Sequence, residues 1–158
     1  MKICRAEGCH IPGMLEILKQ VGEVHRQIRP DIFRSGAQKY DGKDLEAILK
    51  DPKLPIFVAV KGDFVAGYCF CQLRDFRGSG VMTDRQELYI DDLCVDEGCR
   101  GQKIASRLYA HVLAYARELG CGFITLNVWC GNDGAMKFYE SIGLKPRSIT
   151  MDMALEEH

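Results

Sequence analysis

Apolar residues recur at the spacing of an α-helix in four stretches of the chain. In the first, Met14, Leu18 and Val21 are separated by four and three residues, and Pro30 lies beyond the end of the stripe. The third is the longest and is followed by glycines, which commonly end helices. The predicted helices are 12–28, a short helix around 45–49, 102–119, and a helix that begins at Asn132 or Asp133 and ends near 143.

Six other stretches are short and rich in β-branched or aromatic residues, which is typical of strands. They are 2–5, 56–61, 64–73, 86–95, 123–129 and 149–155. The stretches 29–42 and 74–85 lack periodicity and are predicted to be loops that shape a site. The order of elements predicts a single α/β domain over residues 1–158, with a mixed sheet and helices on both faces.

Length, charge and the apolar runs argue against nucleic-acid-binding, membrane-spanning and secreted proteins. The 158 residues suit one domain, and 21 basic residues against 22 acidic ones argue against a nucleic-acid partner. Apolar runs such as 56–60 are far shorter than the roughly 20 residues that a membrane-spanning helix needs. The first five residues lack the apolar stretch of a signal peptide. We therefore expect a cytoplasmic protein with no membrane partner.

Eight cysteines and four histidines raise the question of a metal site. No Cys-x-x-Cys pair occurs and the histidines are scattered, so we expect no metal. Cys69 and Cys71 would lie on one face of a strand. The simplest interpretation is that the cysteines are reduced and act as small buried apolar residues.

The most informative segment is a predicted strand, a loop with Gly98, Arg100 and Gly101, and then the longest helix. The first amides of a helix have no partner within the helix, and together with the helix dipole they favour an anion such as phosphate. Arg100 adds positive charge. The alternative is that Gly98 and Gly101 only make a tight turn between strand and helix.

This segment resembles the GNAT acetyltransferase family, whose phosphate loop reads Arg or Gln, two residues, Gly, one residue, then Gly or Ala. Here it is Arg100-Gly101-Gln102-Lys103-Ile104-Ala105, with Lys103 where the family usually has glycine. The strand before it, from Tyr89 to Val95, and the later pattern Asn132, Ala135, Phe138, Tyr139 and Gly143 also match. The resemblance covers about residues 89–147.

The resemblance implies a sheet whose central strands, 86–95 and 123–129, splay apart around acetyl-CoA as a co-substrate. The cofactor-binding residues that it implies are Leu93, Cys94, Val95, Arg100, Gly101, Gln102, Lys103, Ile104, Ala105, Ser106, Asn132, Ala135, Phe138 and Tyr139. Family members act on amines and many form homodimers, so we expect a small-molecule or peptide amine as the acceptor and a homodimer as the assembly.

Three residues are predicted to be catalytic. Tyr139 matches the position of the family's proton donor to the leaving thiolate; the alternative is an aromatic residue packed in the core. Asp91 and Asp92 resemble the acid pair of diamine acetyltransferases and favour a cationic amine, although either could simply pair with a nearby base. As neighbours on a strand they are expected to face opposite sides. Glu87 and Tyr89 are weaker candidates, and Trp129 suits the core or a wall of the site better than catalysis.

The sequence thus predicts an N-acetyltransferase in which a primary amine attacks acetyl-CoA directly within a ternary complex. A carboxylate would take the proton of the amine, and a backbone N–H would hold the oxyanion. The first alternative is a non-catalytic acyl-CoA-binding regulator on the same fold. A dinucleotide-binding protein is disfavoured, because no Gly-x-Gly-x-x-Gly follows the first strand. The acceptor could be a polyamine, an aminoglycoside, an amino acid or a protein amine.

Overall fold

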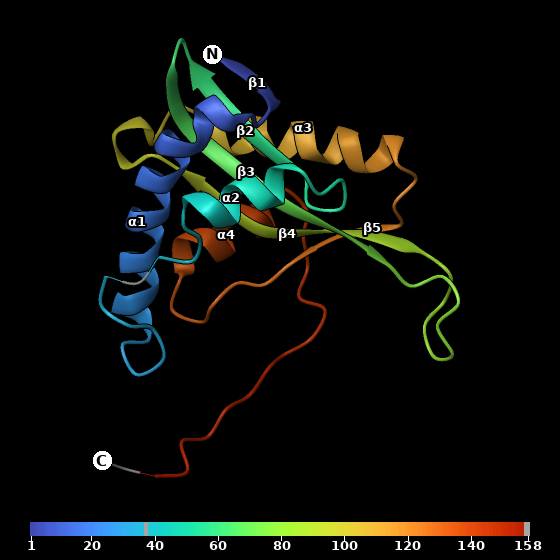
Figure 1. The fold of residues 1–158 in the computed structure, drawn as a ribbon. Coiled ribbons are helices and arrows are strands. Elements are labelled where there is room, and N and C mark those ends of the chain that lie inside the picture. Colours follow the sequence, from blue (N-terminus) through green and yellow to red (C-terminus); the bar gives the residue numbers. More distant parts are fainter. Residues whose placement is uncertain (37, 157–158) are drawn as a thin grey trace. The chain divides into compact units, whose positions relative to one another are not determined.

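The computed structural model describes residues 1–36 and 38–156, which fall into two compact units, Met1–Asn127 and Val128–His158. Among the described residues, the first unit contains a sheet with the strand order β1-β2-β3-β4-β5 (Figure 1). The strands are β1 (Lys2–Arg5), β2 (Ile56–Lys61), β3 (Phe64–Asp75), β4 (Gln86–Val95) and β5 (Phe123–Leu126). Neighbouring strands are antiparallel except β4 and β5, which are parallel. The predicted mixed sheet is confirmed.

Helices cover both faces of this sheet, as predicted. On one face, α1 (Ile11–Ile28) and α2 (Gly42–Leu49) bury Met14, Leu18 and Leu45 against β2 and β3. On the other face, α3 (Ile104–Glu118) buries a stripe of residues four apart against the same strands (Figure 1). The stripe is Ile104, Leu108, Val112 and Ala116. Each helix therefore packs through the apolar face that its periodicity indicates.

Local signals explain where the helices begin. Pro12 lies in the first turn of α1, where its missing N–H costs no hydrogen bond. The side chain of Asp41 accepts from the backbone N–H of Asp44, 2.8 Å away, and caps α2. Short 3-10 turns, Gly8–His10 and Glu97–Cys99, precede α1 and follow β4. None of the helices in the described part of the chain combines the length and hydropathy that a membrane crossing requires.

Two predicted boundaries and one predicted strand are wrong. The helix predicted from 102 begins at Ile104, because Gly101 and Lys103 have left-handed backbone conformations. The strand predicted over 123–129 ends at Leu126, where its ladder with β4 also ends. Residues 149–155 form no strand, because an extended segment becomes one only beside a hydrogen-bonding neighbour. Ala37, in the predicted loop 29–42, lies outside the described residues.

The second unit contains α4 (Asp133–Ser141) followed by a long segment without regular structure. The side chain of Asn132 accepts from the backbone N–H of Ala135, 3.3 Å away, and so caps α4 as the sequence predicted. Gly143 has a φ of 103°, a conformation that a residue with a side chain rarely adopts, and it follows the end of the helix.

Candidate active site

A β-bulge in β4 places both predicted acids on one face of the sheet. Asp92 pairs with Phe70 on β3, and the next pair along is Ile90 with Cys71, so Asp91 is an extra residue. Ile90 and Leu93 both pack in the core beneath α3, although they are three residues apart. Without the extra residue they would lie on opposite faces. The expectation that Asp91 and Asp92 face opposite sides is therefore wrong.

Both carboxylates contact the aromatic cluster on the face covered by α1 and α2. Asp91 accepts from the hydroxyl of Tyr40 at 2.8 Å, and Asp92 accepts from the hydroxyl of Tyr68 at 2.6 Å. The ring of Phe70 lies between these tyrosines, with centroid distances of 5.6 Å to Tyr40 and 4.6 Å to Tyr68. Two negative groups thus converge beside an apolar wall.

Asp91 is paired with a base. The ammonium Nζ of Lys39, from the loop between α1 and α2, lies 2.8 Å from the Asp91 carboxylate. The Asp91 side chain is only 11% exposed, whereas that of Lys39 is 49% exposed. A small hollow of about 150 Å³ lies beside Asp91, with Tyr40 and Phe70 in its wall. The pair therefore joins a solvent-accessible primary ammonium group to a sheltered carboxylate.

Asp92 is held by the hydroxyl of Tyr68. Burial raises the pKa of Asp92 to about 6, against the opposing effects of the Tyr68 hydrogen bond and the Lys39 charge. Burial also raises the pKa of Tyr68, and the negative charge of Asp92 raises it further, so Tyr68 stays a hydrogen-bond donor. A carboxylate that titrates near pH 6 is a better proton acceptor at neutral pH than an ordinary aspartate.

The strands β4 and β5 part at this point. Their parallel ladder runs from Glu87–Phe123 to Ile90–Leu126, while β4 continues to Val95 with β3 as its partner. In the described residues, the stretch Asp91–Val95 has no ladder to β5. Leu93, Cys94 and Val95, which are half-buried, belong to this stretch, and their contact with the cofactor stays a prediction. Burial raises the pKa of the Cys94 thiol to about 12, so this cysteine is not a nucleophile near neutral pH.

The predicted phosphate loop is held from both sides. On one side, Gln20 of α1 donates to the Asp96 carboxylate at 3.0 Å and accepts from the backbone N–H of Glu97 at 3.0 Å. Asp96 also accepts from the backbone N–H of Gly98 at 2.9 Å. On the other side, Lys61 at the end of β2 donates to the Gln102 side chain. The loop therefore reaches the start of α3 in a defined shape.

Lys103 has a left-handed backbone conformation, which suits the glycine that the resemblance places at this position. Its φ of 59° makes it the one non-glycine residue in the described part of the chain with a left-handed conformation. Such a position favours glycine, since a side chain there costs about 1–2 kcal/mol. From Ile104 onward, the first amides of α3 have no acceptor within the helix and remain available for an anion. Arg100, Gly101, Gln102 and Lys103 are exposed around them.

Close packing at Gly67 supports the start of α3. A Cβ atom there would lie 3.0 Å from the Cys94 carbonyl oxygen and 3.2 Å from a side-chain carbon of Ile104.

Sequence reasoning missed this glycine and also Gln20, Lys39, Tyr40 and Tyr68. The signal for Tyr68 was a hydroxyl within an otherwise apolar strand, and for Lys39 and Tyr40 their place in a loop predicted to shape the acceptor pocket.

The weaker candidates on β4 have structural partners. Glu87 is buried and pairs with Arg85, whose Nε lies 2.9 Å from the carboxylate. The hydroxyl of Tyr89 accepts from the Asn127 side chain at 3.1 Å, and the Arg74 guanidinium lies 3.7 Å from the centre of the Tyr89 ring. These contacts favour a supporting role for both residues over proton transfer.

The second unit carries the remaining predicted residues. Asn132 caps α4, and Ala135, Phe138 and Tyr139 follow on the helix. The rings of Phe138 and Tyr139 stack with their centres 5.2 Å apart. Trp129 is 38% exposed. The roles of Asn132 and Tyr139 towards the cofactor stay predictions.

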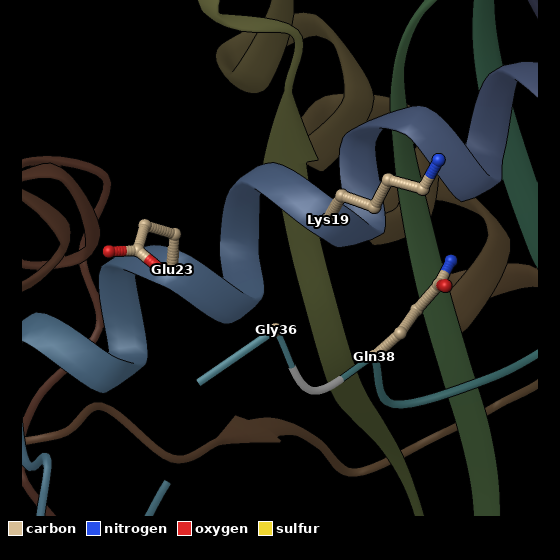
Figure 2. A pocket seen from close by; sticks show the side chains of 4 residues that line it. All are labelled: Lys19, Glu23, Gly36 and Gln38. Carbon is tan, nitrogen blue, oxygen red and sulfur yellow. The ribbon is translucent and has the colours of Figure 1, made fainter. Parts of the chain in front are cut away.

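A second hollow and the cysteines add no chemistry to the site. The hollow, of about 300 Å³, lies between α1 and the following loop and is lined by Lys19, Glu23, Gly36 and Gln38 (Figure 2). The cysteines in the described chain form no disulfide, and Cys69, Cys71 and Cys99 are buried, whereas Cys9 and Cys130 are exposed. No cluster of three or more metal-ligating side chains occurs in the described residues.

Comparisons with known proteins show which family and which solved structures this chain is similar to. A model of the acetyltransferase (GNAT) family matches residues 22–144. A mutant of the BH1408 protein from Bacillus halodurans is similar in structure, with a TM-score of 0.93, 29% identity, and coverage of 99% of this chain and 100% of that one. An aminoglycoside acetyltransferase from an uncultured soil sample shares the fold, with a TM-score of 0.70, 16% identity and 98% coverage of both chains. None of the curated proteins matches in sequence.

Proposed function

The chain belongs to the GNAT acetyltransferase family, and we propose that it transfers an acetyl group from acetyl-CoA to a cationic primary amine, which attacks directly in a ternary complex. The observation that carries the proposal is the bulge at Asp91, which brings two carboxylates to the point where β4 and β5 part. In this proposal, backbone groups of β4 beyond Ile90 would contact the thioester, and the two acids would hold an ammonium group beside it.

The cofactor would lie along β4 beyond the end of its ladder with β5 and reach the start of α3. The pantetheine amides would pair with the backbone near Leu93 and Val95. The pyrophosphate would lie against the loop from Arg100 and the first amides of α3, from Ile104 to Ser106. The fixed loop shape and the uncompensated amides support this placement, because they present donors to an anion without reorganisation.

Asp92 would act as the general base. The ammonium group of the acceptor gives a proton to the Asp92 carboxylate, and the neutral nitrogen then attacks the thioester carbon. The carbon–sulfur bond then breaks, and the CoA thiolate takes a proton, for which Tyr139 is the proposed donor. The second proton that the nitrogen loses as it becomes an amide would return to the Tyr139 oxygen, and Asp92 would release its proton to solvent. The pKa of about 6 supports this role, because Asp92 is ionised at neutral pH yet basic enough to accept a proton transiently.

Asp91 would hold the positive charge of the acceptor. It already binds a primary ammonium group, that of Lys39, at 2.8 Å. An acceptor ammonium could replace the lysine, since half of the Lys39 side chain is exposed and able to swing away. This contact favours a cationic acceptor, such as a polyamine, over a neutral one.

Calorimetry followed by a transfer assay tests the proposal. The wild type should bind CoA, and Arg100→Ala should weaken binding at least several-fold, with Arg107→Ala as a control at a later position on α3. Acetyl transfer should then be seen with cationic amines and not with neutral ones. Absence of CoA binding would refute the cofactor site. Binding without transfer to any amine would instead indicate a non-catalytic acyl-CoA-binding protein.

A further inference from the structure

A primary amine of the chain itself lies at the two acids of the candidate site. The Nζ atom of Lys39 lies 2.8 Å from the Asp91 carboxylate. Burial raises the pKa of Asp92 to about 6, and the Lys39 charge opposes this rise, so the same charge also acts on the second acid. The bulge in β4 brings both carboxylates to one face of the sheet. The Lys39 ammonium group therefore lies where the proposed function would place the amine acceptor.

The backbone on either side of Lys39 is anchored. On one side, the Gln38 side chain donates to the backbone carbonyl of Leu15 in α1, 3.3 Å away. On the other side, the hydroxyl of Tyr40 donates to the Asp91 carboxylate at 2.8 Å. A group tethered beside a reaction site meets its partner at an effective concentration of about millimolar or more. The Lys39 amine is therefore held beside the acids without having to bind from solution.

A simpler interpretation is that Lys39 only neutralises the charge of Asp91. An ion pair with an exposed partner contributes little to stability, however, because water screens the charges and the long side chain loses freedom. The Lys39 side chain is 49% exposed, and its four-carbon stem is flexible. The ammonium group can therefore leave Asp91 and turn towards Asp92, the next residue on β4. These residues and the loop from Arg100 all belong to the first unit, so the arrangement does not depend on the second.

We propose that the chain acetylates its own Lys39, with acetyl-CoA as the donor. This self-acetylation rests on the function proposed above, since it uses the same thioester and the same base. The Lys39 ammonium group gives one proton to the Asp92 carboxylate, which releases it to solvent, and the neutral Nζ atom attacks the thioester carbon. The carbon–sulfur bond breaks, and a second proton from the nitrogen ends on the sulfur. The products are an acetyl-lysine amide and the CoA thiol.

Acetylation of Lys39 would change how the site binds its next acceptor. The amide carries no positive charge, so the ion pair with Asp91 is lost. The Asp91 carboxylate then accepts a cationic amine from solution without competition from the lysine. Incubation of the wild type with acetyl-CoA should therefore lower KM for a cationic amine several-fold. Lys39→Gln, which resembles acetyl-lysine, should show the lower KM without prior incubation.

Mass spectrometry tests the site of modification. In wild type incubated with acetyl-CoA and no other amine, Lys39 should be acetylated about tenfold faster or more than Lys43, an exposed lysine in α2. Lys39→Arg should lose this gain of one acetyl group in the intact mass, and Lys43→Arg should keep it. The fraction acetylated per unit time should not depend on protein concentration. Equal labelling of both lysines, or a fraction that rises with protein concentration, would overturn the proposal.

Two further measurements separate self-acetylation from the proposed function. Asp92→Asn should slow the labelling of Lys39 about 10²-fold or more, because the base is gone, and leave that of Lys43 unchanged. Excess putrescine, a cationic diamine, should slow the labelling of Lys39 several-fold by competition. An undiminished rate in Asp92→Asn, or acetylation of putrescine with none on Lys39, would overturn self-acetylation, and the second result would leave the proposed function intact. Acetylation of neither amine, in a chain that binds CoA, would overturn both.

Discussion

Asp92→Asn tests whether the buried, ionised carboxylate of Asp92 lowers the stability of the fold. Burial raises the pKa of Asp92 from 3.8 to about 6 in the folded chain. The folded state therefore holds the proton more tightly than the unfolded chain does. The resulting stabilisation is complete below about pH 4, and it is lost as the pH rises through 6. Above that pH the ionised carboxylate destabilises the fold.

The size of this destabilisation follows from the difference between a pKa of 3.8 in the unfolded chain and about 6 in the folded chain. At 1.36 kcal/mol for each pKa unit, the difference corresponds to about 3 kcal/mol. Asparagine has the same shape, carries no charge, and can still accept from the Tyr68 hydroxyl. Its NH₂ group brings donors that need acceptors, which offsets part of the gain. We expect Asp92→Asn to be more stable than the wild type by about 1–3 kcal/mol at pH 7.5, or about 2–10 °C in Tm.

Thermal unfolding followed by circular dichroism from pH 4 to pH 8 measures this difference. The gain should be present above pH 6 and fall towards zero near pH 4. The same variant should lose acetyl transfer, because it lacks the proposed base. Asp91→Asn is the matched control: it removes the partner of Lys39 and should not be stabilised. A destabilised Asp92→Asn, or a gain independent of pH, would refute the reasoning.

Three further changes test other parts of the site. Lys39→Met should lower KM for a cationic amine by several-fold in steady-state assays without lowering kcat, because the ammonium that competes for Asp91 is gone. A higher KM would show that Lys39 only supports the loop. Lys103→Gly should raise stability by about 0.5–1 kcal/mol in denaturant titrations, since glycine relieves the left-handed strain but gains freedom when unfolded. Tyr139→Phe should reduce kcat about 10²- to 10⁴-fold with CoA affinity unchanged in calorimetry; a wild-type kcat would exclude Tyr139 as the acid.

The sequence alone determined the elements whose side chains follow a period. The stripe of α1, the longer stripe of α3 and the apolar strands β2 to β4 were readable because each element buries one face or both. The loop from Arg100 was recognisable because its glycine indicates a tight turn and its arginine adds positive charge at the start of a helix. These features depend on neighbours within a few residues, so a linear pattern is enough to find them.

Only the tertiary structure decided the features that depend on pairing between distant segments. The bulge at Asp91 exists because β4 has one residue more than β3 between two successive pairs of the ladder. The sequence of neither strand by itself shows where this extra residue lies. The same holds for the contacts of Tyr68 and Lys39 with the two acids, which join residues 24 and 52 positions apart. The segment 149–155 has the pattern of a strand but is not one in the structure, because pattern sets only the capacity to pair.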